Sequence, residues 1–179
     1  MSAASLRNVA VEAGLSIGSV RHYFRDHSEL LLFAMEELSR RIDDRLRAHA
    51  DRLLGKDLSE DPLAHTEELL AEILPLDDTR RTEAAVWHAF TAAARYRPEL
   101  RARADQVLAG TQALMRRVLT SAQELGGLPQ CLDVEVESVR LAGLLDGLTV
   151  EAVHVPDRLP PELLRKVVRR HLAALASGA

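Results

Sequence analysis

The stretch of sequence that decides the fold is SLRNVAVEAGLSIGSVRHYFRDHSELLL, residues 5–32. Apolar residues in its first third recur at the i, i+3, i+4 and i+7 spacing of an amphipathic helix, and Ser5 can cap that helix. Gly14 follows at the position where a helix end favours a residue that tolerates a positive φ. Ser16 is the next N-cap candidate and opens a short helix through Phe24. The stretch therefore predicts two helices joined by a tight turn.

The second of these helices gathers small, polar and basic residues. A short helix held after a tight turn projects its first turn outward, where it can enter a DNA major groove about 12 Å wide. Free N–H groups at its start can bind phosphate oxygens, to which Ser16 and Ser19 add hydroxyl donors. Gly18 permits a close approach to the DNA backbone. The exposed side adds charge or hydrogen-bond donors from Arg21, His22, Tyr23 and Arg25.

A set of spaced residues runs through the same stretch: Val9-Ala10, Ala13-Gly14, Ser16, Gly18-Ser19, Tyr23-Phe24 and Glu29-Leu30-Leu31. As a set, these residues resemble the helix-turn-helix of the TetR family of transcriptional regulators. The resemblance implies that the second helix contacts phosphates or base edges and that the start of the following helix contacts the backbone. The residues expected to contact DNA are Ser5, Ser16, Gly18, Ser19, Arg21, His22, Tyr23 and His27.

Two positions depart from the commonest family pattern. Arg21 stands where an aromatic residue is frequent, and it can read a guanine through two hydrogen bonds. His27 stands where a lysine is usual, and it gives a weaker, pH-dependent phosphate contact. Several residues also have a purely structural interpretation when taken singly: Leu15, Val20 and Phe24 as core, Ser16 as a helix cap, and the ring of Tyr23 as a packed group.

The rest of the chain shows helical apolar spacing, with capping residues and prolines at the expected helix ends. The predicted helices are the one capped by Asp26 or Ser28 and extending to Leu53, then 62–74, 79–96, 98–125, 133–153 and 161–176. The segment GKDLSEDP, residues 55–62, is the clearest linker. We expect an all-α fold of about eight helices. Its helix-turn-helix region with a connecting helix covers residues 1–50, and a helical effector-binding and dimerisation domain covers residues 51–179.

Residues 62–179 also resemble the ligand-binding and dimerisation part of TetR-family proteins. LPLDDTRRTEAAVWHAFTAAARYRPEL (74–100) and LAGLLDGLTVEAV (141–153) are similar to the betaine-pathway, choline-sensing subclass. The resemblance implies that the last two helices pair with those of a second subunit. Apolar residues on more than one side of 133–153 agree with such an interface. The residues expected there are Leu141, Leu144, Leu148, Leu164, Val168, His171 and Leu175.

An effector pocket is expected among the apolar residues of the same half. The candidates are Trp87, Phe90 and Thr91, with Met115 and Leu119 opposite and His88, Gln112 and Asp146 as the polar groups. Trp87 and Phe90 can equally fill the core, and Asp146 can be a hydrogen-bonding group at the subunit interface. A single tryptophan makes no aromatic cage for a cation, so the resemblance does not identify a ligand.

Composition excludes several other classes of protein. The chain has 179 residues, 47% of them hydrophobic and 28% charged, as is typical of a globular domain. Uncharged stretches are too short for a membrane span, a secretory signal is missing, and a lone cysteine, Cys131, fits a cytoplasmic protein. The net charge of −4 requires any DNA-binding patch to be local. Scattered histidines and missing phosphate-binding motifs predict no metal, no cofactor and no enzymatic activity.

The sequence therefore favours a ligand-responsive, homodimeric transcriptional repressor whose partners are operator DNA, a second copy and an unknown small molecule. Dimerisation suits DNA binding because two short helices about 34 Å apart can address a palindromic operator. The alternative is a dimeric small-molecule-binding protein that no longer binds DNA productively. We consider this alternative because TetR-family regulators have a further helix before the one that corresponds to residues 5–13. In this sequence only four residues, beginning with Met1, precede Ser5. Without that helix we expect exposed apolar surface on Leu6, Val9, Leu30 and Phe33.

Overall fold

The computed structural model describes residues 7, 10–11, 14–53 and 61–178 of the chain. Within these residues every regular element is a helix, which confirms the all-α prediction. The elements are α2 (Ile17–Tyr23), α3 (His27–Leu53), α4 (Pro62–Ala71), α5 (Asp78–Ala94), α6 (Pro98–Glu124), α7 (Val134–His154), the 3₁₀ turn η1 (Pro156–Arg158) and α8 (Pro161–Ser177). Arg7, Ala10 and Val11 are helical, whereas Ser5 lies outside the described residues.

Helix starts follow the capping chemistry of the sequence. Proline occupies the first turn of α4, α6 and α8, where a missing N–H costs nothing. The start of α3, which the sequence left open between two caps, is capped by Asp26. Its Oδ1 accepts hydrogen bonds from the N–H groups of Ser28 and Glu29 at 2.8 and 3.0 Å. Aspartate carboxylates cap three further helices through Asp61, Asp77 and Asp133.

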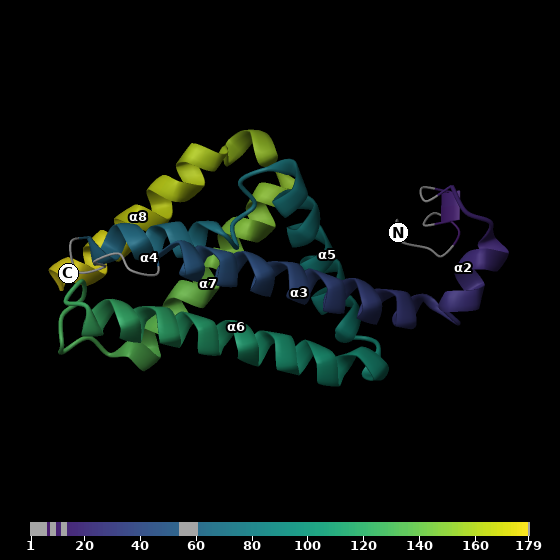
Figure 1. Cartoon of the computed structure of the whole chain (residues 1–179), viewed down its shortest axis with the longest axis horizontal. Helices are drawn as coiled ribbons and strands as arrows, with labels where there is room; N and C mark the ends of the chain where they lie inside the picture. Colours follow the sequence, from purple (N-terminus) through teal and green to yellow (C-terminus); the bar gives the residue numbers. More distant parts are fainter. Residues whose placement is uncertain (1–6, 8–9, 12–13, 54–60, 179) are drawn as a thin grey trace.

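The long helix α3 joins α2 to the other helices. Its 27 residues span about 40 Å. Figure 1 shows α2 at one end of α3, apart from the remaining helices, which lie along the rest of α3. The domain boundary predicted at residue 50 falls inside α3. The helix that carries α2 is therefore also a wall of the C-terminal half, where it packs against α5 and α6.

The two larger hydrophobic cores hold the C-terminal half together. One joins α3 to α5 and α6 through residues such as Met35, Phe90 and Leu100, all fully buried. The other joins α4, α6, α7 and α8, with Met115 and Leu119 at its centre. Burial of each large apolar side chain stabilises the fold by about 1.5–3 kcal/mol. These cores fix α3 against the bundle along much of its length.

Four residues expected at the subunit interface lie instead inside a single chain. Leu141, Val168 and Leu175 are buried in the core of α4, α6, α7 and α8, and Leu164 packs with Ala152 and Leu159. One apolar stripe of α7 and one of α8 face the chain's own core. These side chains are therefore already buried in a single copy of the chain. The other three, Leu144, Leu148 and His171, are half-buried.

Candidate functional site

The turn before α2 has the geometry that the sequence predicts. Gly14 adopts φ +64°, in the left-handed region that favours glycine. The Leu15 N–H donates to the carbonyl of Ala10 at 2.8 Å and closes the turn. Val20 is 3% exposed and anchors α2, as expected for a core residue. Leu15, for which a core position was expected, is 52% exposed because the described part of the chain places no element over it.

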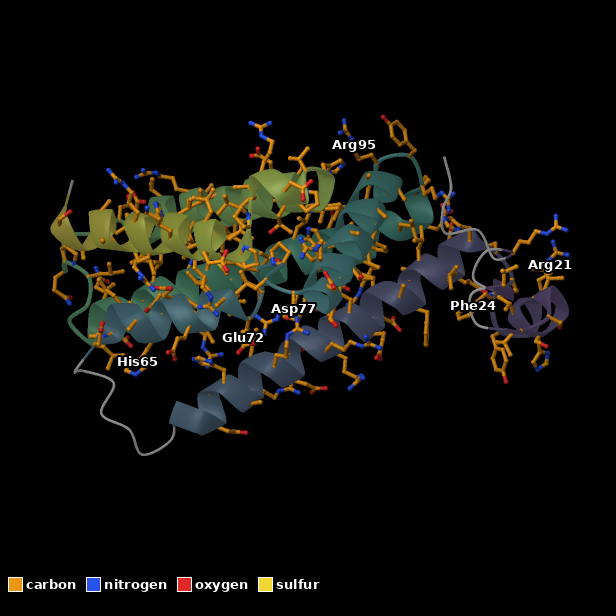
Figure 2. All side chains as sticks on the ribbon, turned by 90° about the horizontal axis from the view of Figure 1, so that it is seen from above. Arg21, Phe24, His65, Glu72, Asp77 and Arg95 are labelled. Atoms are coloured by element: carbon orange, nitrogen blue, oxygen red, sulfur yellow. The ribbon has the colours of Figure 1, made fainter. Side chains whose placement is uncertain are left out.

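The outer face of α2 carries all of its predicted DNA contacts. Ser16, Gly18, Ser19, Arg21, His22 and Tyr23 are exposed. Tyr23 is 75% exposed, and its ring meets that of His22 edge to face at 5.4 Å between centroids. Figure 2 shows Arg21 at the outer end of the molecule. Phe24 is half-buried, and its ring lies 5.4 Å from that of Phe33. Of the apolar residues expected to be exposed, Phe33 is 55% exposed, but the expectation is wrong for Leu30, which is buried in the first turns of α3. Leu6 and Val9 lie outside the described residues.

Two hydroxyl groups meet at the start of α2. The Ser16 Oγ accepts a hydrogen bond from the Ser19 N–H at 3.0 Å, which confirms Ser16 as the N-cap. The two Oγ atoms lie 2.9 Å apart and are hydrogen-bonded. A Cβ added to Gly18 would lie 3.6 Å from the Ser16 Oγ, which is ordinary van der Waals contact. The fold itself therefore does not require glycine at this position.

Hydrogen bonds tie the first turn of α3 to the α5–α6 turn. The buried Ser28 donates through Oγ to Glu99 Oε1 at 2.7 Å and accepts from Arg97 Nη1 at 3.3 Å. The Ser28 hydrogen bond lowers the pKa of Glu99. His27 is half-buried beside them. On the exposed side, hydrogen bonds from Arg25 lower the pKa of Glu29. The helix-turn-helix is thus joined to the body by polar groups as well as by the continuous α3.

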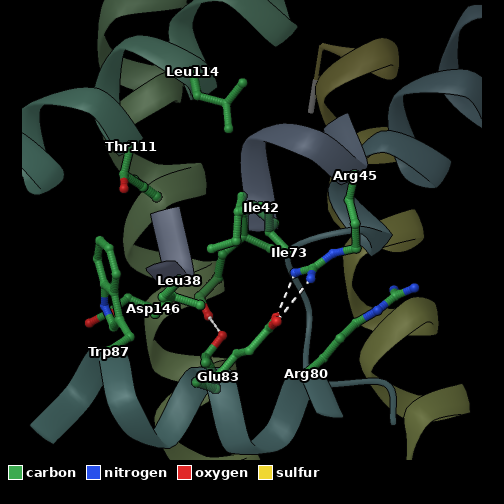
Figure 3. A pocket seen from close by; sticks show the side chains of 14 residues that line it. Leu38, Ile42, Arg45, Ile73, Arg80, Glu83, Trp87, Thr111, Leu114 and Asp146 are labelled. Carbon is green, nitrogen blue, oxygen red and sulfur yellow. Dashed lines mark hydrogen bonds and ion pairs between the residues drawn. The ribbon is translucent and has the colours of Figure 1, made fainter. Parts of the chain in front are cut away.

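A cavity of about 130 Å³ lies between α3, α5, α6 and α7 (Figure 3). Its walls are largely apolar, with Leu38 and Ile42 from α3 and Leu145 from α7. Of the residues expected to contact an effector, Trp87 and Asp146 line it. This cavity is called the effector cavity below.

The other expected effector contacts lie outside this lining. Phe90, Met115 and Leu119 are fully buried in the two cores. The Gln112 side chain donates to the Ser138 hydroxyl at 2.9 Å, and Thr91 donates to the carbonyl of Trp87 at 3.0 Å. Burial lowers the pKa of His88, and the nearby Asp146 carboxylate opposes this shift. The core interpretation left open for Phe90 therefore agrees with its position.

A two-point ion pair, which the sequence did not identify, lines the effector cavity. Arg45 of α3 donates through Nη1 and Nη2 to the Glu83 carboxylate of α5 at 3.0 and 2.7 Å (Figure 3). Its side chain is 25% exposed and that of Glu83 is 11% exposed. Arg80 lies beside the pair and donates to the carbonyl of Ala71 at 2.6 Å. The sequence feature that could have identified this pair is the position of Arg45. It lies seven residues after Leu38 and therefore on the same face of α3.

Asp146 is the acidic group of this cavity that has no direct cation. It makes no hydrogen bond or ion pair with the described residues and is exposed at the cavity wall. Figure 3 places it on the same side as Trp87, across the cavity from Arg45. Arg45 is paired with Glu83, and the other lining cation, Arg80, is paired with Glu72 and Asp77, so the free Asp146 carboxylate gives the cavity a negative side.

Neither a metal centre nor a membrane span emerges from the parts of the chain that the structure describes. No three His, Cys, Asp or Glu side chains there are grouped closely enough to hold a metal ion. None of the described helices has the length and apolar character needed to cross a bilayer.

The chain is similar to known regulators along nearly its whole length. Residues 62–177 match the family model of the BetI-type transcriptional repressor C-terminal domain. The HTH-type transcriptional regulator PksA of Bacillus subtilis is 35% identical over 176 residues, which cover 98% of this chain and 81% of PksA. The HTH-type transcriptional regulator BetI of Stenotrophomonas maltophilia is 28% identical over 167 residues, which cover 93% of this chain and 80% of BetI.

Solved structures show the same architecture. A transcriptional regulator from Rhodococcus sp. RHA1 superposes with a TM-score of 0.73 at 29% identity, covering 98% of this chain and 87% of that one. A regulator from Saccharomonospora viridis in complex with choline superposes with a TM-score of 0.73 at 19% identity, covering 94% and 84%. At that identity the second likeness shows the fold alone.

Proposed function

The chain belongs to the TetR family of transcriptional regulators, and we propose that it is a homodimeric repressor that a small molecule releases from a palindromic operator. One observation carries the proposal. A single helix, α3, carries the exposed face of α2 at one end and lines the effector cavity with Leu38, Ile42 and Arg45. A ligand that displaces α3 therefore also displaces α2.

The DNA-binding part of the proposal rests on the outer face of α2. The Ser16 and Ser19 hydroxyls stand at the helix N-terminus, where phosphate oxygens bind. Arg21, His22 and Tyr23 follow on exposed positions and supply donors for phosphates or base edges. A helix of 7 residues makes few base contacts, so two copies on one operator are needed for useful specificity.

The dimer part rests on an unpartnered stripe of α7. Val136, Val139 and Val150 are 52%, 56% and 37% exposed, and Gly143 and Gly147 between them are exposed too. These five positions follow a spacing of three and four residues, so they lie on one face of the helix. Small and apolar residues on one face permit close packing of a second copy. On α8, Leu163 is 38% exposed.

The effector part rests on the apolar cavity with its unpaired carboxylate. Apolar walls, the Trp87 ring and the Asp146 carboxylate suit a compact cation with an apolar body. The choline complex of the Saccharomonospora viridis regulator makes choline the first compound to test. Differential binding worth about 1–3 kcal/mol between two positions of α3 suffices for such a response.

A mobility-shift titration tests the proposal. Wild-type protein is expected to retard the DNA upstream of its own gene, and affinity is expected to fall steeply as salt rises. Arg21→Ala is expected to weaken binding at least about tenfold, because an arginine on a base or phosphate contributes about 1–3 kcal/mol. The matched control is Arg101→Ala on α6, which removes an equally exposed arginine.

Two outcomes contradict the proposal. Equal affinity of the Arg21→Ala and Arg101→Ala proteins would exclude this face of α2 as the DNA surface. A dimer that binds small molecules but retards no selected DNA would favour the alternative, a ligand-binding protein without productive DNA binding.

A further inference from the structure

A second, larger cavity of about 620 Å³ lies between α3, α4 and α6. It is at the end of the molecule away from α2, where Figure 2 shows His65, opposite Arg21. On α6 the lining residues are Leu114, Arg117, Val118, Ser121, Ala122 and Leu125. Their spacing places all six on one face of that helix. The volume is in the range of small-molecule sites in proteins.

One side chain borders both this cavity and the effector cavity. Among the described residues, Leu114 alone lines both. Trp87, the single tryptophan of the chain, lines the effector cavity and not the larger one. The two spaces are therefore neighbours, and fluorescence from Trp87 reports on one of them.

The charges around the larger cavity favour an anion. Arg117 at its rim makes no hydrogen bond or ion pair with the described residues. The hydroxyl of Ser121, one turn further along α6, likewise has no hydrogen-bond partner among them, and neither has the buried Nδ1 of His65. The only acidic residue in the described lining, Asp43, lies 3.9 Å from the guanidinium of Arg47. A cation and unsatisfied polar atoms thus remain for a ligand.

The remaining surface of the cavity is apolar. Leu46 of α3, Leu69 of α4 and Val118 of α6 come from the three different walls. An aliphatic chain placed among them loses its hydration, which favours binding by about 0.8 kcal/mol for each buried CH₂ group.

We propose that the larger cavity is a second ligand site, separate from the effector cavity, for an aliphatic molecule with an anionic head group. Arg117 and Ser121 bind the head group. The chain lies against Leu69, Leu114 and Val118. Carboxylates and phosphate monoesters share the required chemistry, since both offer oxygen acceptors to a guanidinium.

Calorimetric titration of the purified full-length protein tests the site without DNA. The probes are decanoate, decyl phosphate and decyltrimethylammonium, each below the concentration at which it forms micelles. At least one anion is expected to bind at least tenfold more tightly than the cation, and the stronger anion identifies the head group. Arg117→Gln is expected to weaken that binding about tenfold. The matched control, Arg116→Gln, removes the neighbouring arginine that pairs with Glu135 and is expected to bind as the wild type does.

Fluorescence of Trp87 locates the bound molecule. Saturation of the wild type with the anion is expected to leave the emission unchanged, whereas Leu114→Ala, which shortens the side chain that borders both cavities, is expected to make it respond. Equal affinities for the anions and the cation would overturn the proposal, as would equal affinities of the Arg116→Gln and Arg117→Gln proteins. A change of Trp87 emission in the wild type would place the ligand in the effector cavity instead. None of these outcomes depends on operator binding, so the repressor proposal stands or falls separately.

Discussion

At the scale of single residues, Gly18 is the position where helix stability and the proposed DNA contact make opposite demands. It lies inside the 7-residue helix α2, where glycine costs conformational entropy, yet an added Cβ would meet only ordinary contacts. Packing within the protein does not require glycine at this position, so we expect that contact with another molecule does. Close approach of a phosphate backbone is such a contact.

Replacing Gly18 by alanine is therefore expected to have two effects of opposite sign. Unfolding free energy rises by about 0.5–1 kcal/mol through helix propensity, while operator affinity falls because the methyl group meets the DNA backbone. Urea denaturation and mobility shift measure the two quantities. Gly110→Ala on α6, where an added Cβ also has open space, is the control that should gain stability and keep its operator affinity. Unchanged operator affinity in the Gly18→Ala protein would remove the argument for close approach.

Two histidines are expected to make stability depend on pH. Burial holds the pKa of His88 and of His171 below the ordinary value of 6.5. Below pH 6.5 the unfolded chain therefore takes up protons that the folded chain does not, so stability is retained above this pH and lost as pH falls through it. Urea denaturation between pH 7.5 and 5.5 should show a decreasing unfolding free energy, with a shallower decrease in His88→Gln and His171→Gln. If the unfolding free energy of both variants decreases as steeply with falling pH as that of the wild type, these two histidines are not the source of the pH dependence.

At the scale of elements, α3 depends on polar attachments as well as on its apolar stripe. Arg45 binds Glu83 of α5, and Ser28 binds Glu99 at the start of α6. The two attachments lie on either side of the first core, so they fix both the position and the direction of α3. Apolar contacts alone permit a helix to slide along its partner, whereas paired hydrogen bonds define one register.

Breaking the Arg45–Glu83 pair on one side is expected to destabilise the protein. Glu83→Gln leaves the guanidinium in a mostly buried position without its counter-charge, which costs about 3 kcal/mol, the low end for a buried pair, because the Arg45 side chain keeps some exposure. The double variant Arg45→Met, Glu83→Leu removes both charges and should lie within about 1 kcal/mol of the wild type. Denaturant titrations measure these differences. Glu37→Gln, which breaks the solvent-accessible pairs with Arg40 and Arg41 on the same helix, is the control expected to have little effect. If the Glu83→Gln protein is as stable as the double variant, the ion pair does not fix the position of α3.

Most elements could be predicted from the sequence because their ends carry local signals. Asp77 and Asp133 accept hydrogen bonds from N–H groups three residues later, and these contacts need no tertiary structure. The Arg45–Glu83 pair could not be found in this way, since it joins residues 38 positions apart. Phe90 could not be assigned from the sequence for a similar reason. Helical spacing predicts which face of α5 carries Phe90, but not whether that face lines a cavity or packs in a filled core.

At the scale of the whole molecule, the proposed homodimer depends on which surface of α7 is left uncovered by the chain's own fold. The sequence shows that 133–153 is apolar on several sides, but it does not show which side the chain covers itself. The inner stripe of Leu141 and Leu145 is buried in the chain's own core. The outer stripe around Val139 and Gly143 is what remains for a partner.

If the proposed homodimer forms through the outer stripe of α7, Gly143→Arg is expected to make the protein monomeric. A large charged side chain on the outer stripe keeps a second α7 from approaching, while the chain's own fold is spared because an added Cβ has open space. Light scattering after size-exclusion chromatography gives the mass. Gly110→Arg, the same substitution at another open helical glycine, should leave the dimer intact. A dimeric Gly143→Arg protein would move the interface elsewhere.

In the proposed repressor, the length of α3 determines how far α2 moves when a ligand tilts the helix at the effector cavity. Arg45 and His27 are 18 residues apart on this helix, a distance of about 27 Å. A tilt of about 7° at Arg45 would sweep the far end through about 3 Å, close to the rise of one base pair. In the proposed repressor, a tilt of this size at the effector cavity is enough to displace α2 by about one base-pair step on DNA.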